Sequence, residues 1–211
     1  DIWMFTLTRS GTYWAANASS LARILKYTQS TGTFTTYGMF DTSHSDFAAQ
    51  PWWWSKPVKH NNTFYLGHSG HGVGYENQWG GGGPHSGKIL KVTINGINDF
   101  SYEILGAGIG GYGFDSSQPD HMPNVEGPSG KVDISLARFY EPRPQKVINN
   151  KLYICDKYNG CIKTLDLTTN EVELLLDTRT RMSGWGRTES LYTNPTQLHF
   201  NTRVQRGSQP R

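Results

Sequence analysis

The residues best able to do chemistry gather between positions 60 and 85, where histidines alternate with glycines. His68 and His71 stand three positions apart, and His85 follows in the same glycine-rich stretch. Because imidazole nitrogens bind zinc and copper, these three side chains are candidate ligands of a divalent metal. The spacing is looser than in established Cys/His zinc motifs, and exposed loop histidines give the same pattern. Both readings stay open, and no other cofactor is indicated.

Aromatic side chains form the second candidate site. Trp52, Trp53 and Trp54 are consecutive, and Tyr75, Trp79 and Tyr112 lie in glycine-rich stretches. Exposed rings of this kind stack on sugars or anchor protein contacts. Successive residues of a strand point to opposite faces, so the three tryptophans are equally suited to core packing between sheets. The cluster therefore predicts either a glycan-binding or protein-binding surface, or a filled core.

No catalytic residue is predicted. The chain contains no Gly-x-Ser-x-Gly element, no phosphate-binding loop and no paired carboxylate motif. An enzyme that used a central metal would draw its ligands from inner strands, and the segments expected there offer His60, Asn149, His199 and Asn201 but no carboxylate. These absences weigh against a metal-dependent hydrolase or lyase.

Cysteines and glycosylation sequons bear on the compartment. Five residues separate Cys155 from Cys161, at the end of one expected strand and the start of the next, and we predict a disulfide between them. The alternative is a pair of free thiols. Asn17 and Asn61 begin acceptor sequons and are predicted glycosylation sites. Together these features favour an extracellular, secreted protein.

Composition supports the same class. Charged residues make up 18% of the 211-residue chain and aromatics 13%, with 24 glycines, a balance typical of turn-rich all-β proteins. The net charge of +3 is too small and too scattered for a nucleic-acid-binding face. No apolar run approaches the 18 or more residues that a membrane span needs. We therefore expect neither a nucleic acid partner nor a membrane span.

Four short apolar runs between positions 145 and 176 are separated by turn-forming residues. They predict a four-stranded antiparallel meander, which buries too little by itself and must stack on copies. Each of three second strands carries a Tyr followed two positions later by a small residue, as a crowded contact between sheets would select. The expected third strands are 23–28, 88–93 and 161–166; the second strands are 12–16, 64–68 and 152–156; the fourth strands are 33–37, 101–105 and 171–176.

Residues 136–176 resemble the NHL-repeat class of β-propeller. The resemblance rests on Leu-Ala-Arg-Phe-Tyr-Glu-Pro at 136–142, Leu-Tyr-Ile-Cys-Asp at 152–156 and Cys-Ile-Lys-Thr-Leu-Asp at 161–166. It implies four-stranded antiparallel blades around a central axis. The two upstream copies match only in strand character and order, because Ala16 and His68 replace the Asp of the second strand. Residues 191–198 look like the opening of a further repeat.

The predicted propeller is incomplete. We expect one partial propeller domain over residues 1–202, with blades at about 2–38, 56–105 and 136–177, an extra leading strand at 196–201, and a basic flexible tail at 203–211. Propellers close with roughly four to eight blades. The chain is therefore expected to need a partner, either a second copy in a homo-oligomer or another chain, or to be one piece of a longer polypeptide.

Three functions follow from these features. The first is an extracellular interaction or structural module that associates through its incomplete blade edges. The second is a carbohydrate-binding propeller that uses the Trp and Tyr side chains. The third is the metal-dependent hydrolase or lyase, which would use the histidine cluster. The low blade count favours the first.

Overall fold

The computed structural model describes residues 1–8, 20–40, 55–67, 87–107, 130–139, 142–156, 161–177, 186–193 and 198–204. Within these ranges the chain forms strands and turns and no helix, so the all-β prediction is confirmed. Among the described residues, no helix has the length and apolar character that crossing a membrane would take.

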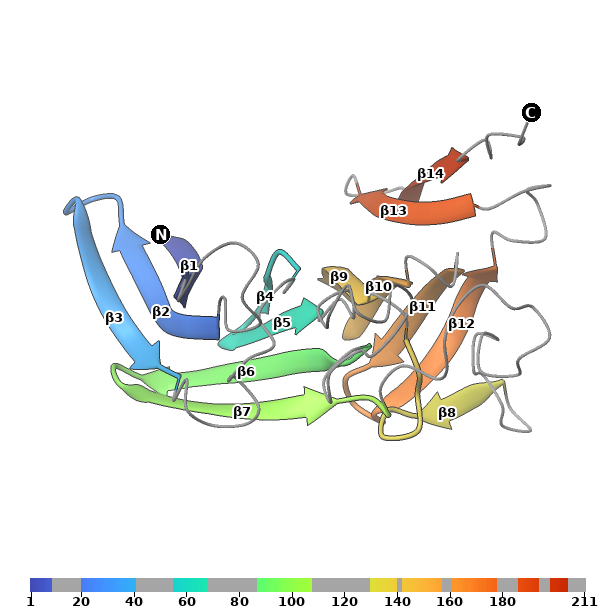
Figure 1. The fold of residues 1–211 in the computed structure, drawn as a ribbon, viewed down its shortest axis with the longest axis horizontal. Coiled ribbons are helices and arrows are strands. Elements are labelled where there is room, and N and C mark those ends of the chain that lie inside the picture. Colours follow the sequence, from blue (N-terminus) through green and yellow to red (C-terminus); the bar gives the residue numbers. More distant parts are fainter. Residues whose placement is uncertain are drawn as a thin grey trace, which may run out of the picture.

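The strands form four antiparallel sheets (Figure 1). The first sheet has the order β1 (Ile2–Thr8), β2 (Ser20–Thr28), β3 (Thr33–Met39). The second has the order β4 (Val58–His60), β5 (Thr63–Gly67), β6 (Ile89–Gly96), β7 (Asp99–Leu105). Both are meanders in which neighbours in sequence are neighbours in the sheet.

The third sheet is the meander β9 (Pro142–Ile148), β10 (Lys151–Asp156), β11 (Cys161–Asp166), β12 (Glu171–Asp177), with β8 (Lys131–Asp133) added beside β12. The fourth sheet is the hairpin of β13 (Gly186–Thr193) and β14 (Leu198–Val204). The four sheets follow one another in chain order around an arc, and β13 lies beside β9 and β10 (Figure 1).

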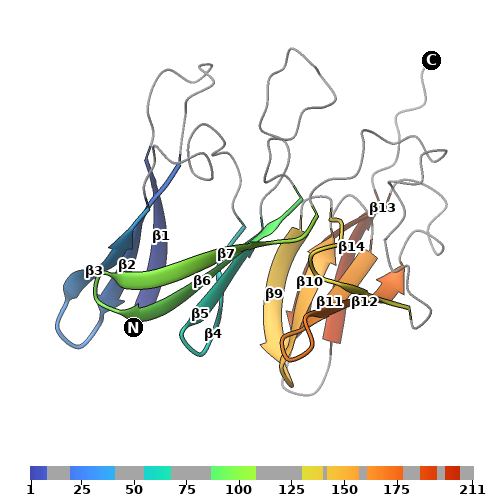
Figure 2. The ribbon, with the colours of Figure 1, turned by 90° about the horizontal axis from the view of Figure 1, so that it is seen from below.

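Tight turns line one side of this arc. The two-residue turns at Asn61–Asn62 and Asn149–Asn150 both lie there (Figure 2). Asn61, Asn149 and Asn150 have φ values of 53°, 48° and 59°. Asparagine tolerates this left-handed conformation better than other residues with a side chain, which explains why asparagine-rich pairs separate the strands.

The strand order differs from the predicted one at two places. β1 pairs directly with β2, and β2 has β3 on its other side, so β1 lies where a second strand was expected from residues 12–16, which are outside the described part of the chain. The expected leading strand at 196–201 is largely contained in β14, which pairs with β13 and so belongs to a hairpin. β8 was not anticipated, because three residues carry too little pattern to mark a strand.

An apolar core fills each junction between the first three sheets. The core between the first and second sheets contains Ile24, Phe40, Phe64, Leu66, Leu90, Val92 and Ile94. The core between the second and third sheets contains Tyr65, Ile89, Leu105, Ile134, Ala137, Phe139, Leu152, Ile154, Leu165 and Val172. Alternate residues of β5 enter different cores, so the second sheet is buried on both faces.

Gly67 is a point of close contact between the second and third sheets. A Cβ at this position would overlap the backbone carbonyl of Pro142 on β9. The sequence predicted a crowded contact two positions after Tyr65, and at Gly67 that prediction is confirmed.

The predicted disulfide is wrong. No disulfide joins Cys155 and Cys161, and both residues are fully buried. β10 and β11 pair Asp156 with Cys161 and Cys155 with Ile162, so the two cysteines are one register step apart. Because side chains alternate between the faces of a sheet, the two thiols point to opposite faces. A hairpin with paired ends therefore does not bring these two sulfur atoms together.

Candidate interaction surface

One face of the first sheet has no described sheet packed against it. Trp3, Phe5 and Ile24 pack against the second sheet. The pairs Ile2–Tyr27 and Met4–Leu25 alternate with them in register and so point away from it. Phe34 on β3 pairs with Tyr27, and their rings lie 4.9 Å apart. We name the apolar side chains Ile2, Met4, Leu25, Tyr27, Phe34 and Met39 the outward face.

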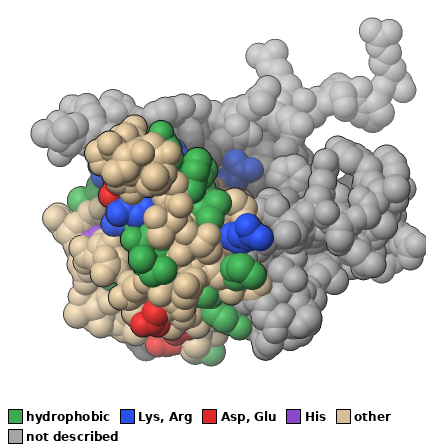
Figure 3. Space-filling view, turned by 90° about the vertical axis from the view of Figure 1, so that its left-hand side faces the viewer, with side chains coloured by type: hydrophobic (Ala, Val, Ile, Leu, Met, Phe, Trp, Pro, Cys, Tyr) green, Lys and Arg blue, Asp and Glu red, His purple; other side chains and the backbone are tan. Residues whose placement is uncertain are grey.

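Three side chains of the outward face are exposed, and the other three are half-buried. Ile2 is 48% exposed, and Phe34 and Met39 are each 62% exposed. Figure 3 looks at the end of the molecule that the first sheet forms and shows hydrophobic side chains gathered there among basic and acidic ones. Single exposed apolar residues are ordinary, whereas several on one sheet face indicate a contact surface.

The way the described sheets stack on one another indicates what this face could contact. In the second sheet, the cross-strand pairs Phe64–Val92 and Leu66–Leu90 face the first sheet and are buried. In the third sheet, Leu152–Leu165 and Ile154–Lys163 face the second sheet in the same way. The pairs Ile2–Tyr27 and Met4–Leu25 hold the corresponding place in the first sheet. The outward face is therefore the side on which a preceding sheet would stack.

The first sheet also has a free strand position. β4 and β9 lie outside β5 and β10, whereas the described part of the first sheet has no strand outside β1. The outer backbone groups of β1 consequently have no strand partner among the described residues. An edge of this kind accepts a strand from another segment or chain.

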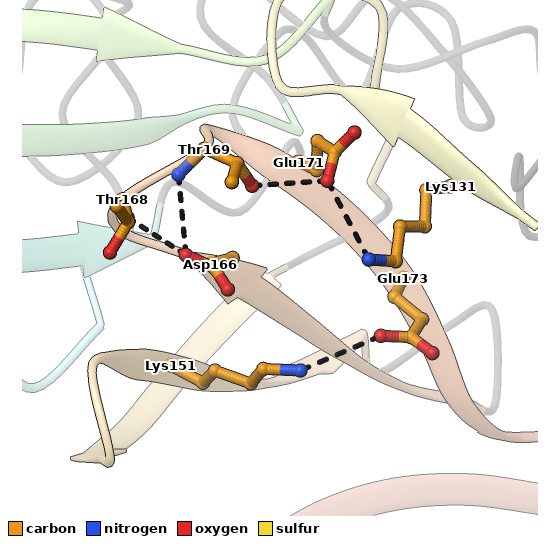
Figure 4. Close-up of polar contacts among 7 residues, drawn as sticks. All are labelled: Lys131, Lys151, Asp166, Thr168, Thr169, Glu171 and Glu173. Atoms are coloured by element: carbon orange, nitrogen blue, oxygen red, sulfur yellow. Dashed lines mark hydrogen bonds and ion pairs between the residues drawn. The ribbon is translucent and has the colours of Figure 1, made fainter. Parts of the chain in front are cut away.

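Polar contacts dominate a different region, over β8 and β12 of the third sheet (Figure 4). Lys131 Nζ lies 3.6 Å from Glu171 Oε2, and Lys151 Nζ lies 3.7 Å from Glu173 Oε2. Asp166 accepts backbone hydrogen bonds from Thr168 and Thr169 in the turn between β11 and β12. These two bonds, followed by the nearby lysines, lower the pKa of the Asp166 carboxyl. All these groups pair with one another within the third sheet. We therefore assign these polar contacts to the stability of the sheet and not to ligand binding.

A buried ion pair holds the segment before β9 in place. Lys163 Nζ donates hydrogen bonds to Asp156 Oδ2 at 2.8 Å and to the Arg138 carbonyl at 2.6 Å. The same ammonium lies 4.9 Å from the centre of the Phe139 ring. Both charged side chains are 0% exposed. These residues carry the resemblance described above, and here they fasten the Ala-Arg-Phe segment to the meander and make no site open to a ligand.

Most residues singled out from the sequence lie outside the described part of the chain. These are Asn17, Trp52, Trp53, Trp54, His68, His71, Tyr75, Trp79, His85 and Tyr112. Among the described residues, no three His, Cys, Asp or Glu side chains are grouped to hold a metal.

Asn61 is the one predicted glycosylation site within the described residues. It is exposed at the tip of the turn between β4 and β5, and its side-chain amide lies 3.3 Å from His60 Nε2. Thr63, the hydroxyl residue of the sequon, begins β5 and lies 3.2 Å from the Thr93 hydroxyl. An exposed turn is the setting that glycosylation requires.

Comparison of the chain with protein families, curated proteins and solved structures finds no match.

Proposed function

We propose that the chain is an interaction module of the β-propeller type, which associates with a second copy or another chain through the outward face and the β1 edge. The observation that carries the proposal is the correspondence between this face and the buried faces of the second and third sheets. A partner that stacks a further sheet here would continue the arc toward a ring.

The proposed architecture agrees with the packing of the described sheets. They are antiparallel, they stack face to face in chain order, and they curve around one arc (Figure 1). NHL-type repeats would account for the buried ion pair between Lys163 and Asp156 in the third sheet. The second sheet has Leu90 in the place of Lys163, and its sequence has His68 where the Asp would stand, so both members of the pair change together.

An extracellular location is part of the proposal. It rests on the sequon at the exposed Asn61 turn, since Cys155 and Cys161 form no disulfide that would support it. Secretion from eukaryotic cells followed by N-glycan removal should lower the mass of the chain. An unchanged mass, with Asn61 recovered unmodified, would contradict this part.

Native mass measured over a range of concentrations tests the association. The expected result is a particle larger than one chain, and Phe34→Asp should dissociate it by placing a charge in the apolar contact. Leu136→Asp is the matched control, because Leu136 is 63% exposed in the third sheet's turn segment and lies off the outward face. A stable monomer at all concentrations and with every candidate partner, or equal effects of the two variants, would refute the proposal.

A further inference from the structure

A hollow of about 250 Å³ opens to solvent between the first and second sheets. Trp3 and Tyr37 line it from the first sheet, and Phe64 lines it from the second. Asn62, in the turn between β4 and β5, and Asn95, near the end of β6, stand at its rim. The hollow therefore opens on the side of the tight turns and is separate from the outward face.

The wall of the hollow is aromatic. The Trp3 ring centre lies 4.7 Å from that of Tyr37 and 5.1 Å from that of Phe64. The rings are tilted against one another, so each holds its neighbour in place. Rigid aromatic surfaces of this kind suit the C–H face of a sugar ring, and the Asn62 amide can donate to and accept from hydroxyl groups. Asn95 Nδ2 donates a hydrogen bond to Asp99 Oδ1 at 3.2 Å, which leaves its second N–H and its carbonyl oxygen for a ligand.

Two ammonium groups border the same space. Lys26 Nζ lies 5.9 Å from the centre of the Trp3 ring, and Lys59 Nζ lies 6.0 Å from the centre of the Phe64 ring. Lys26 already contacts a carboxylate, because Asp1 Oδ2 lies 2.8 Å away. Lys59 is exposed and has no carboxylate partner among the described residues. At the hollow, the Lys26 ammonium therefore binds a carboxylate of the chain, whereas the Lys59 ammonium is available to a ligand.

We propose that this hollow binds a single sugar ring that carries a carboxylate, as in the uronic acid units of acidic glycans. Its volume is below the roughly 300–1,000 Å³ typical of pockets for drug-sized ligands, which limits the occupant to about one ring. The apolar face of the ring lies against Trp3 and Phe64, the hydroxyl groups meet the asparagine amides, and the carboxylate lies toward Lys59.

Titration of the full chain with glucuronate, glucose and acetate, followed by amide NMR shifts, tests the proposal. Glucuronate should shift the amides of Asn62 and Asn95 and bind at least about tenfold more tightly than either glucose or acetate, because only glucuronate has both the ring and the charge. Absence of shifts at these amides would overturn the proposal. Equal affinity for acetate would reduce the site to a simple anion contact, and equal affinity for glucose would remove the role of Lys59; either result also refutes the proposal.

Lys59→Met supplies the decisive variant, because it removes one exposed ammonium without disturbing a core. It should weaken glucuronate binding at least about tenfold and leave the melting temperature unchanged. Lys91→Met is the matched control, since Lys91 is a partly exposed lysine of the second sheet that pairs with Glu103 and does not line the hollow. Equal effects of the two variants on glucuronate binding would show that general charge, and no built site, attracts the ligand.

Discussion

Lys163 is a fully buried ammonium, and its removal should be costly. Lys163→Leu leaves the Asp156 carboxylate buried without its 2.8 Å partner. Breaking a buried pair in this way typically costs about 3–5 kcal/mol, whereas replacing both members by apolar residues is often close to neutral. Unfolding in urea should therefore show that Lys163→Leu with Asp156→Leu is more stable than Lys163→Leu alone. The second sheet already has a leucine, Leu90, at the position that corresponds to Lys163, so an apolar residue is compatible with this place in a sheet. A double variant that is less stable than the single one would contradict this account.

The Cys155 thiol should make stability depend on alkaline pH. Burial raises the pKa of Cys155 to about 12, with Asp156 raising and Arg143 lowering it by smaller amounts. The raised pKa favours the folded state fully below the pKa of an exposed thiol, about 8.5, and this contribution is lost as the pH rises toward the folded value. From about pH 8.5 to 10.5, the free energy of unfolding should fall by about 2 kcal/mol more in the wild type than in Cys155→Ala. Equal slopes for the two proteins would contradict the prediction.

At the scale of elements, Gly67 sets how closely the second and third sheets approach. Gly67→Ala places a methyl group against the Pro142 carbonyl, which is backbone and cannot move aside cheaply. Overpacking of this kind costs about 1–3 kcal/mol, so urea unfolding should show a loss of at least that size. Gly96→Ala on β6 is the control, because the nearest atom to its Cβ is a side-chain carbon of Asp99 at 3.8 Å. If both variants unfold alike, the sheets are not in tight contact at Gly67.

The elements show which parts of the fold were predictable from sequence. Local signals sufficed for the second and third meanders, because asparagine-rich turns separate apolar runs and set which strands are adjacent. Pairing within the first sheet was not predictable in this way. Residues 12–16 carry the same aromatic pattern as the second strands, yet β1 takes that place because register is decided by contacts across the whole sheet.

The same limit applied to the candidate sites. The disulfide prediction was wrong because Cys155 and Cys161 are offset by one residue in the pairing of β10 with β11. The spacing of the two cysteines in the sequence does not reveal this offset. The hollow was missed because Trp3, Lys59 and Asn95 are far apart in the chain and meet only when the first two sheets stack. An exposed blade surface was expected from the sequence, because three blades are too few to close a ring. Its individual residues could be named only from the register of β1 with β2.

At the scale of the whole molecule, the β1 edge distinguishes strand addition from face-to-face stacking alone. If a partner adds a strand beside β1, the outer amides of β1 gain hydrogen bonds, and their hydrogen exchange should slow by at least about tenfold in the associated form. The amides of Glu171, Val172 and Glu173 on β12 should not change, because β8 already pairs with these residues. Exchange measured on the wild type and on Phe34→Asp at the same concentration separates the two states. Slowed exchange confined to the wild type would place a partner strand at β1. Equal exchange at β1, with the outward face still needed for association, would show that the partner stacks its sheet on the first one and leaves the edge open.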